Sequence, residues 1–314
     1  MIQTDYVSEI KSLKKKKNAI ILAHYYQTGD IQDIADFVGD SLALSQKATS
    51  NSADIILFAG VKFMAETAKI LSPDKKVLLP DMNAGCSLAD SCNAADFSKF
   101  IENNPGRTVI TYVNTNIEIK ALSDIICTSS NALRIIESLP EGEKIIFAPD
   151  RNLGNYLMNK TDRDMVIWNG ACHVHEEFSL EAIIRLKKDY SGAKVIAHPE
   201  CKQPVLMVAD YIGSTAAMLS FTKKDESDTF IVATESGIIH QMKKENPEKK
   251  FIPAPPKDST CGCSECNFMK LVTMEKIYNC LLKEEPEILI NEELIIRAQK
   301  PVKRMMELSE KSRN

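Results

Sequence analysis

The amino-acid sequence predicts an α/β protein made of three similar units, and two observations carry this prediction. Three short apolar runs that end in polar residues recur along the chain: NAIILAHYY (18–26), TVITYVNTN (108–116) and KVIAHPE (194–200). In each unit a hydroxyl residue follows 17 positions after the polar end of the run: Ser41 after His24, Ser129 after Tyr112 and Thr215 after His198. The hydroxyl positions lie 88 and 86 residues apart, which indicates an internal repeat.

Each unit continues in the same order of elements. The apolar run, a first strand, is followed by a segment that we expect to be helical: ADFVGDS (35–41), SDIICTS (123–129) and ADYIGST (209–215). A second strand follows in ADIILFAG, EKIIFAPD and DTFIVATE, and a third in KKVLLPDMNAG, RDMVIWNGA and KKFIPAPPKDS. Strands that alternate with helices predict parallel sheets in α/β/α layers.

We therefore expect three α/β/α sandwich domains with short parallel sheets, related by pseudo-threefold symmetry around a central active-site cavity. Their expected limits are residues 1–86, 87–172 and 173–267, with helices in 268–314 that pack on the first unit. The alternative is three independent domains with separate sheet edges, which would leave the matched polar positions unexplained.

The composition is that of an ordinary globular protein. Of 314 residues 44% are apolar and 26% charged, and the net charge is −4. The basic residues are scattered, which argues against a nucleic-acid partner. The apolar stretch after Lys14–Lys17 is too short to span a bilayer, and no secretory leader pattern is present, so we expect a cytoplasmic protein without a membrane partner. In a reducing compartment, nine cysteines indicate metal ligands or catalytic groups.

Conspicuous polar residues follow the first strands, and cysteines follow the third strands. Ligands of open α/β sheets bind beyond the carboxyl ends of the strands, so these side chains are expected to meet in one cavity. The polar residues are His24, Tyr26, Tyr112, Asn114, His198 and Glu200, and the cysteines are Cys86, Cys172 and the group Cys261, Cys263 and Cys266.

Three metal or nucleophile readings of the cysteines stay open. In WNGACHVHEEF (168–178) Cys172 and His175 could form half of a zinc site or a Cys–His catalytic pair. One cysteine from each unit would instead give three thiolates, which is what a [4Fe–4S] cluster with one open iron requires. Such an iron acts as a Lewis acid in dehydration or condensation chemistry.

The hydroxyl residues Ser41, Ser129 and Thr215 lie beside expected helix starts. They could bind anionic substrate groups together with backbone N–H groups, or they could only cap the helices. Glycine-rich phosphate loops of the G-x-G-x-x-G and G-x-x-x-x-G-K types are absent from the sequence.

Several motifs together resemble the quinolinate synthase family over residues 20–280: LAHYYQ (22–27), GDSLALS (39–45), DMNAGCSLADSC (81–92), TYVNT (111–115), WNGACHVHEEF (168–178), AHPEC (197–201), GSTAAM (213–218) and CNFMKLVTMEKIY (266–278). The resemblance implies three α/β domains around a [4Fe–4S] cluster held by three cysteines. It also implies condensation of iminoaspartate with dihydroxyacetone phosphate to quinolinate, phosphate and two waters, in the biosynthesis of NAD.

The resemblance assigns the cluster ligands to Cys86, Cys172 and Cys266. Repeat spacing alone fits Cys261 slightly better, because it lies 89 residues after Cys172 and Cys266 lies 94. Cys263 and Cys266 form a C-x-x-C pair that forms a disulfide in some family members, and Cys92 is expected to be a bystander. The open iron implies sensitivity to oxygen.

The resemblance also assigns the substrate site, which comprises His24, Tyr26, Ser41, Tyr112, Asn114, Ser129, His175, His198, Glu200, Ser214 and Thr215. Glu200 is expected to be a general base with a raised pKa. His24 and His198 would bind substrate oxygens or donate protons, and Tyr26 and Tyr112 would assist. Ser129, Ser214, Thr215 and Asn114 suit phosphate and carboxylates.

Other expectations concern neighbours and rival functions. His173 is expected to be structural, and Glu176 and Glu177 to be helix-start charges. The imine substrate suggests functional coupling to L-aspartate oxidase. Rival readings are another [4Fe–4S] hydro-lyase for a small hydroxy acid, and a zinc-binding or redox-sensing α/β protein that works through CGCSEC (261–266).

Overall fold

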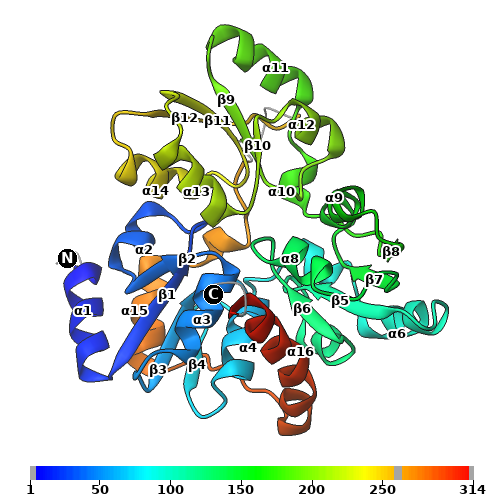
Figure 1. Ribbon diagram of the computed structural model, residues 1–314. Helices are drawn as coiled ribbons and strands as arrows, with labels where there is room; N and C mark the ends of the chain where they lie inside the picture. Colours follow the sequence, from blue (N-terminus) through cyan, green and yellow to red (C-terminus); the bar gives the residue numbers. More distant parts are fainter. Residues whose placement is uncertain (1–4, 258–263, 311–314) are drawn as a thin grey trace.

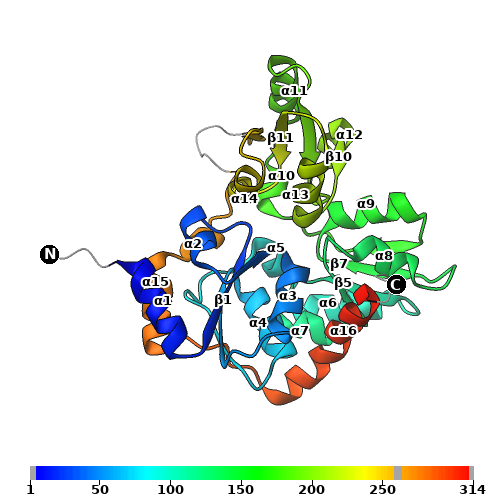
Figure 2. The same ribbon diagram turned by 60° about the vertical axis from the view of Figure 1, so that its left-hand side comes forward.

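A computed structural model describes residues 5–257 and 264–310 and confirms the α/β fold (Figures 1 and 2). It contains three parallel sheets of four strands, ordered β2-β1-β3-β4, β6-β5-β7-β8 and β10-β9-β11-β12. The strands are β1 (Ala19–His24), β2 (Phe37–Gly39), β3 (Ile55–Ala59), β4 (Lys76–Leu78), β5 (Thr108–Tyr112), β6 (Ile125–Cys127), β7 (Ile145–Ala148), β8 (Met165–Ile167), β9 (Lys194–Ala197), β10 (Tyr211–Ile212), β11 (Thr229–Ala233) and β12 (Lys250–Pro253). Every unit thus uses the same strand order.

The helical prediction for ADFVGDS, SDIICTS and ADYIGST is wrong in part, because each segment contains the short edge strand β2, β6 or β10. The repeated aspartate explains the difference. Asp36, Asp124 and Asp210 each accept a hydrogen bond from a first-strand N–H, at 2.7, 2.8 and 2.8 Å, and donate their own N–H to the same residue's carbonyl. This exchange begins the pairing of an edge strand, and the helix α3 or α13 starts only after it.

Helices cover both faces of the sheets. Around the first sheet α1 and α15 lie on one side and α3 and α4 on the other (Figure 1). All five residues of β3 are buried, as is typical of a parallel strand between two helical layers. The helices are α1 (Tyr6–Lys16), α2 (Gly29–Ile34), α3 (Ser41–Thr49), α4 (Lys62–Leu71), α5 (Ser87–Asp90), α6 (Ala94–Glu102), α7 (Ile117–Ala121), α8 (Ala132–Glu137), α9 (Arg151–Thr161), α10 (His173–Glu176), α11 (Leu180–Asp189), α12 (Gln203–Val208), α13 (Thr215–Lys224), α14 (Ile238–Glu245), the 3₁₀ turn η1 (Met269–Leu271), α15 (Met274–Lys283) and α16 (Glu292–Glu310).

The C-terminal helices join two of the units. Helix α15 packs against α1 and β3 of the first unit, whereas α16 lies against α4 of the first unit and against α7, α8 and β6 of the second. The C-terminal segment therefore contacts more than the first unit, and the unit limits at residues 86, 172 and 267 stay a prediction. None of the helices in the described ranges is long and apolar enough to cross a bilayer.

Candidate functional site

The carboxyl ends of the three sheets open on one cavity. Every predicted site residue except Ser214 lines it: His24, Tyr26, Ser41, Cys86, Tyr112, Asn114, Ser129, Cys172, His175, His198, Glu200, Thr215 and Cys266. Its lining also includes residues that the sequence reasoning missed, among them Asp40, Phe63, Met64 and Glu235. We call Cys86, Cys172 and Cys266 the sulfur wall. The polar wall comprises His24, Tyr112, His175, His198 and Glu200.

Two histidines of the polar wall occupy equivalent positions and have the same hydrogen-bonding state. Nδ1 of His24 accepts a hydrogen bond from the N–H of Tyr26 (3.2 Å), and Nδ1 of His198 accepts one from the N–H of Glu200 (3.4 Å). Burial lowers the pKa of both imidazoles to about 3. Both rings are therefore neutral near pH 7 with the proton on Nε2, which suits hydrogen-bond donation to a substrate oxygen better than proton release.

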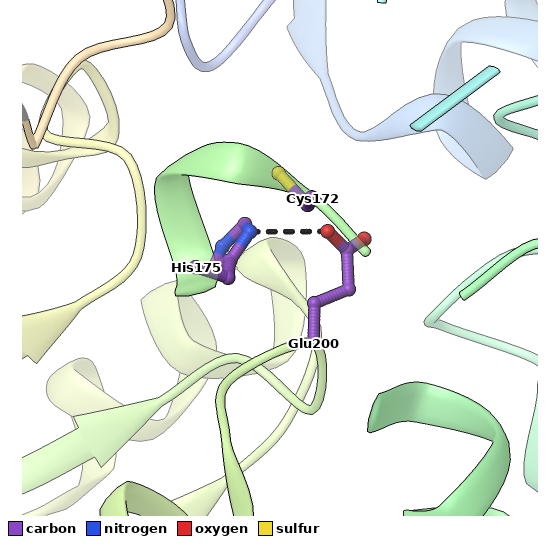
Figure 3. Close-up of side chains that lie close together, drawn as sticks. All are labelled: Cys172, His175 and Glu200. Atoms are coloured by element: carbon purple, nitrogen blue, oxygen red, sulfur yellow. Dashed lines mark ion pairs between the residues drawn. The ribbon is translucent and has the colours of Figure 1, made fainter. Parts of the chain in front are cut away.

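Glu200 is the buried carboxylate at the centre of the polar wall. The hydroxyl of Tyr112 donates to its Oε1 at 2.5 Å, and Nδ1 of His175 lies 3.0 Å from its Oε2 (Figure 3). Burial alone would raise the pKa of Glu200, but His175, His198 and the Tyr112 hydroxyl outweigh it and hold the pKa at about 2. The expected raised pKa is therefore wrong. The reason is that donors from two other segments converge on the carboxylate, which is ionised at neutral pH.

The two cavity tyrosines are neutral donors. Burial and the charge of Glu200 raise the pKa of Tyr26 and Tyr112 well above its ordinary value. The hydroxyl of Tyr26 lies 2.7 Å from Oγ1 of Thr234, and Nε2 of His175 lies 3.0 Å from the same atom. Thr234 thus joins two site residues. The repeat could have indicated it, because Thr234 follows directly after the second strand of its unit.

The repeated hydroxyl residues are not the helix caps. Asp40 caps α3 by accepting from the N–H of Ala43 (2.9 Å), and Ser214 caps α13 by accepting from the N–H of Ala217 (3.3 Å). Ser41 and Thr215 line the cavity instead, so the reading in which they only cap is wrong. Ser214, predicted to bind substrate, lies outside the cavity lining.

A hydroxyl of the second unit joins those two caps. Oγ of Ser130 donates to Oδ2 of Asp40 and lies 2.8 Å from Oγ of Ser214. Asp40, Ser130 and Ser214, one residue from each unit, therefore meet where Asp40 lines the cavity.

The sulfur wall is made of three half-buried thiols at starts of short helical turns. Cys86 precedes α5, Cys172 precedes α10, and Cys266 lies three residues before η1. Burial raises the pKa of Cys86 to about 12, while nearby backbone N–H groups of Ala89 and Leu88 oppose the shift. Burial also raises the pKa of Cys172 and Cys266. Uncoordinated thiols here stay protonated near pH 7, and metal binding would displace the protons.

A compact group of possible ligand atoms joins the two walls. Within residues 5–257 and 264–310, Cys172, His175 and Glu200 are the one set of three whose ligand atoms all lie within 4.8 Å of one another (Figure 3). The sequence paired Cys172 with His175 and missed the third member, which comes from the loop after β9. The cavity can therefore hold a metal cofactor.

The remaining described cysteines lie away from the cavity. Cys92, Cys127, Cys201 and Cys280 are fully buried among apolar side chains, as expected of ordinary core residues. Cys261 and Cys263 lie outside the described residues, so the C-x-x-C reading and the alternative ligand Cys261 stay predictions.

Glu176 of WNGACHVHEEF has a role beyond the predicted helix-start charge. It is an acidic residue in the first turn of the four-residue helix α10, as predicted, and it also pairs with Arg151 of the second unit (3.1 Å) and with Lys202 (2.8 Å). It therefore joins two units. In the same stretch, Nδ1 of His173 lies 2.8 Å from the hydroxyl of Ser87.

Comparison with known proteins adds independent findings. Residues 8–307 match the family model NadA, quinolinate synthetase A protein. The chain is 58% identical over 305 residues to quinolinate synthase from Thermosynechococcus vestitus, covering 97% of this chain and 96% of the relative. It is 56% identical over 307 residues to quinolinate synthase from Chloroherpeton thalassium, covering 98% of this chain and 95% of the relative.

Proposed function

Because this chain belongs to the quinolinate synthetase A family, we propose that it condenses iminoaspartate with dihydroxyacetone phosphate to quinolinate, phosphate and two waters, as a step of NAD biosynthesis. The reaction forms one C–C and one C–N bond between small anionic molecules. One observation carries the proposal: three thiols, one following the third strand of each unit, line the same cavity as the buried polar wall.

The donor set favours a [4Fe–4S] cluster on Cys86, Cys172 and Cys266. Thiolates are soft ligands that suit zinc, copper(I) and iron–sulfur groups. The three thiols come from three separate loops and line one cavity, and three thiolates are what a [4Fe–4S] cluster with one open iron requires. When bound, a cluster with one iron free of protein ligands supplies a Lewis acid for a substrate oxygen.

The polar wall accepts a substrate proton and donates hydrogen bonds to substrate oxygens. Glu200 is ionised and buried, so we assign it as the acceptor for a substrate proton. Its low pKa makes it a weak base, and Tyr112 and His175 keep it aimed at the cavity through contacts of 2.5 and 3.0 Å. His24 and His198 donate from Nε2 to substrate oxygens, and Tyr26 donates a hydrogen bond from its neutral hydroxyl.

The hydroxyl residues bind the anionic groups. Ser41 and Thr215 are the first residues of α3 and α13, where backbone N–H groups lack helical partners and favour anions. Ser129 and Asn114 of the second unit line the same cavity. We assign phosphate and carboxylate binding to these four residues, and leave Ser214 as the cap of α13.

The proposal extends to the surroundings of the enzyme. Iminoaspartate hydrolyses readily, so a source such as L-aspartate oxidase must supply it, and we propose functional coupling to that enzyme. Free thiols and an oxygen-sensitive cluster suit a reducing compartment, which for this chain we propose to be the cytoplasm.

The decisive test is an anaerobic assay with the purified chain. Under argon, with iron and sulfide restored, iminoaspartate and dihydroxyacetone phosphate should give quinolinate and one phosphate per turnover. Iron and acid-labile sulfide should reach about four each per chain. A loaded chain that forms no quinolinate would favour the hydro-lyase reading, and stoichiometric zinc without iron would favour the zinc-binding reading.

A further inference from the structure

The position two residues after the second strand differs among the three units. Strands β3, β7 and β11 end at residues 59, 148 and 233, and the residues two places on are Val61, Asp150 and Glu235. Two units therefore place a carboxylate where the first unit has an apolar side chain. Both carboxylates are completely buried, with 0% exposure, and a buried carboxylate needs hydrogen-bond donors.

In the second unit Asp150 connects a helix to a cysteine loop. Its Oδ1 accepts from the N–H of Leu153 at 2.7 Å, which caps α9, and its Oδ2 accepts from the N–H of Cys172 at 3.3 Å. The second contact spans 22 residues and fixes the backbone of a predicted ligand at the point where β8 has ended and α10 has not begun.

In the third unit Glu235 makes the equivalent connection. Its Oε2 accepts from the N–H of Gly237 at 2.7 Å, and its Oε1 accepts from the N–H of Cys266 at 3.2 Å. Nζ of Lys270 lies 2.9 Å from the same Oε1 and completes the partners of that oxygen. The loops that carry Cys172 and Cys266 differ in length, yet in both a buried carboxylate accepts a hydrogen bond from the N–H of the cysteine.

The first unit lacks the side-chain contact, because Val61 offers no side-chain acceptor. Its cysteine loop is tied by the N–H of Lys62, which donates to the carbonyl of Ala84 at 2.7 Å. The same backbone bond recurs in the other units, from Arg151 to Gly170 and from Ser236 to Ser264, both at 2.8 Å. On the other side of Cys86, the hydroxyl of Ser87 lies 2.8 Å from Nδ1 of His173. The Cys86 loop is therefore supported by backbone contacts and, through Ser87, by His173 at the start of the third unit.

We propose that Asp150 and Glu235 are positioning residues that hold the backbone amides of Cys172 and Cys266 so that both thiols face the metal group. The inference rests on the proposed function, because it assumes that these thiols bind the cluster. Backbone bonds hold the neighbours of both cysteines, whereas the N–H of each cysteine is held by the carboxylate. Partners that orient metal ligands typically change metal retention by 10- to 100-fold. Neither carboxylate needs to touch substrate.

The test of Asp150 uses the variant Asp150→Asn. Its amide oxygen can still cap α9, but its NH₂ then faces the N–H of Cys172, so an acceptor becomes a donor. With the chains loaded under argon, we expect iron to pass to a ferrous chelator about 10- to 100-fold faster than from the parent chain, with a changed visible spectrum. Asn93→Ala is the matched control, because Asn93 caps α6 through the N–H of Asp96 (3.0 Å) and is not a predicted ligand partner.

A second pair of variants tests Glu235 independently, including the case in which Asp150→Asn does not fold. Glu235→Gln should release iron faster by the same order, whereas Lys270→Gln, which leaves the carboxylate on the N–H of Cys266, should stay within about threefold of the parent. Val61→Ala should also release iron at the parental rate.

The outcomes separate the two proposals. A parent chain that binds no iron and sulfide would overturn the proposed function itself. A loaded parent whose Asp150→Asn and Glu235→Gln variants release iron at its own rate would overturn the positioning role alone. Equal acceleration by Asn93→Ala would also overturn it, because general destabilisation would then explain the effect.

Discussion

The two walls of the cavity are built in different ways. Apart from His175, which lies in α10, the polar wall comes from residues at or shortly after the ends of first strands. The register is constant there, so His24, Tyr112 and His198 recur at equal distances from the hydroxyl residues. The sulfur wall comes from loops of unequal length: Cys86, Cys172 and Cys266 lie 8, 5 and 13 residues after β4, β8 and β12. Strand ends fix positions by themselves, whereas loops need added contacts.

The two walls also have different functions. The sulfur wall supplies soft ligands for a metal group, and the polar wall supplies an ionised carboxylate with neutral donors around it. If this division is correct, variants of the two walls should fail in distinguishable ways.

The largest effect is expected from the sulfur wall. Cys172→Ser should abolish quinolinate formation and reduce bound iron several-fold, because a hydroxyl is a poor replacement for a soft thiolate ligand. Iron analysis and the anaerobic assay check both effects. Cys280→Ala, which changes a buried cysteine away from the cavity, should retain iron and activity. Full activity of Cys172→Ser would contradict the proposal that the sulfur wall binds the metal group.

The polar wall should lose activity without losing metal. Glu200→Gln keeps the shape of the side chain but removes the proton acceptor, and we expect kcat to fall by about 10²- to 10⁴-fold. Iron and sulfide should stay at the parental level. Glu176→Gln is the comparison variant, since Glu176 lies outside the cavity lining. Loss of iron in Glu200→Gln would mean that the carboxylate belongs to the metal site.

Acid should destabilise the polar wall of the metal-free chain. The pKa of His24 and His198 is about 3 in the folded chain and about 6.5 when unfolded. Between these values the unfolded chain binds protons that the folded chain does not, so the free energy of unfolding falls as pH falls from 6.5 toward 3. The limiting slope is about 1.4 kcal/mol per pH unit for each histidine.

Urea titrations between pH 5 and 7 measure this slope. Glu200 acts with the same sign below about pH 4.5, because its folded pKa is about 2. His198→Gln should reduce the slope of the free energy of unfolding against pH by up to about 1.4 kcal/mol per pH unit, which is the contribution of one proton. An unchanged slope in that variant would show that His198 is not held neutral by burial.

The smallest effect is expected at the repeated aspartates, which support the strands and not the chemistry. Asp124→Ala removes the acceptor of the Val109 N–H and should lower the free energy of unfolding by about 1 kcal/mol. The kcat of the folded chain should stay unchanged. A large fall in kcat without a change in stability would contradict the structural role of this aspartate.

The same contrast explains what could be predicted from the sequence. The fold class and most of the polar wall could be predicted because the spacing between first-strand ends and hydroxyl residues repeats in the sequence. The third thiol does not, because its loop is longer and repeat spacing favoured Cys261 over Cys266. The edge strands were mistaken for helix because strands of two or three residues carry little periodicity.

Effects that arise between segments were also hidden. The low pKa of Glu200 depends on Tyr112 and His175, which lie 88 and 25 residues away in sequence. The carboxylates Asp150 and Glu235 contact cysteines 22 and 31 residues further along. A closer look at the repeat could have indicated both carboxylates, since they occupy equivalent places after second strands.

Anomalous diffraction from anaerobic crystals at the iron and zinc edges tests the central claim most directly. We predict an iron signal bounded by the Sγ atoms of Cys86, Cys172 and Cys266. A zinc signal at Cys172, His175 and Glu200, or an iron signal bound by Cys261 in place of Cys266, would contradict it.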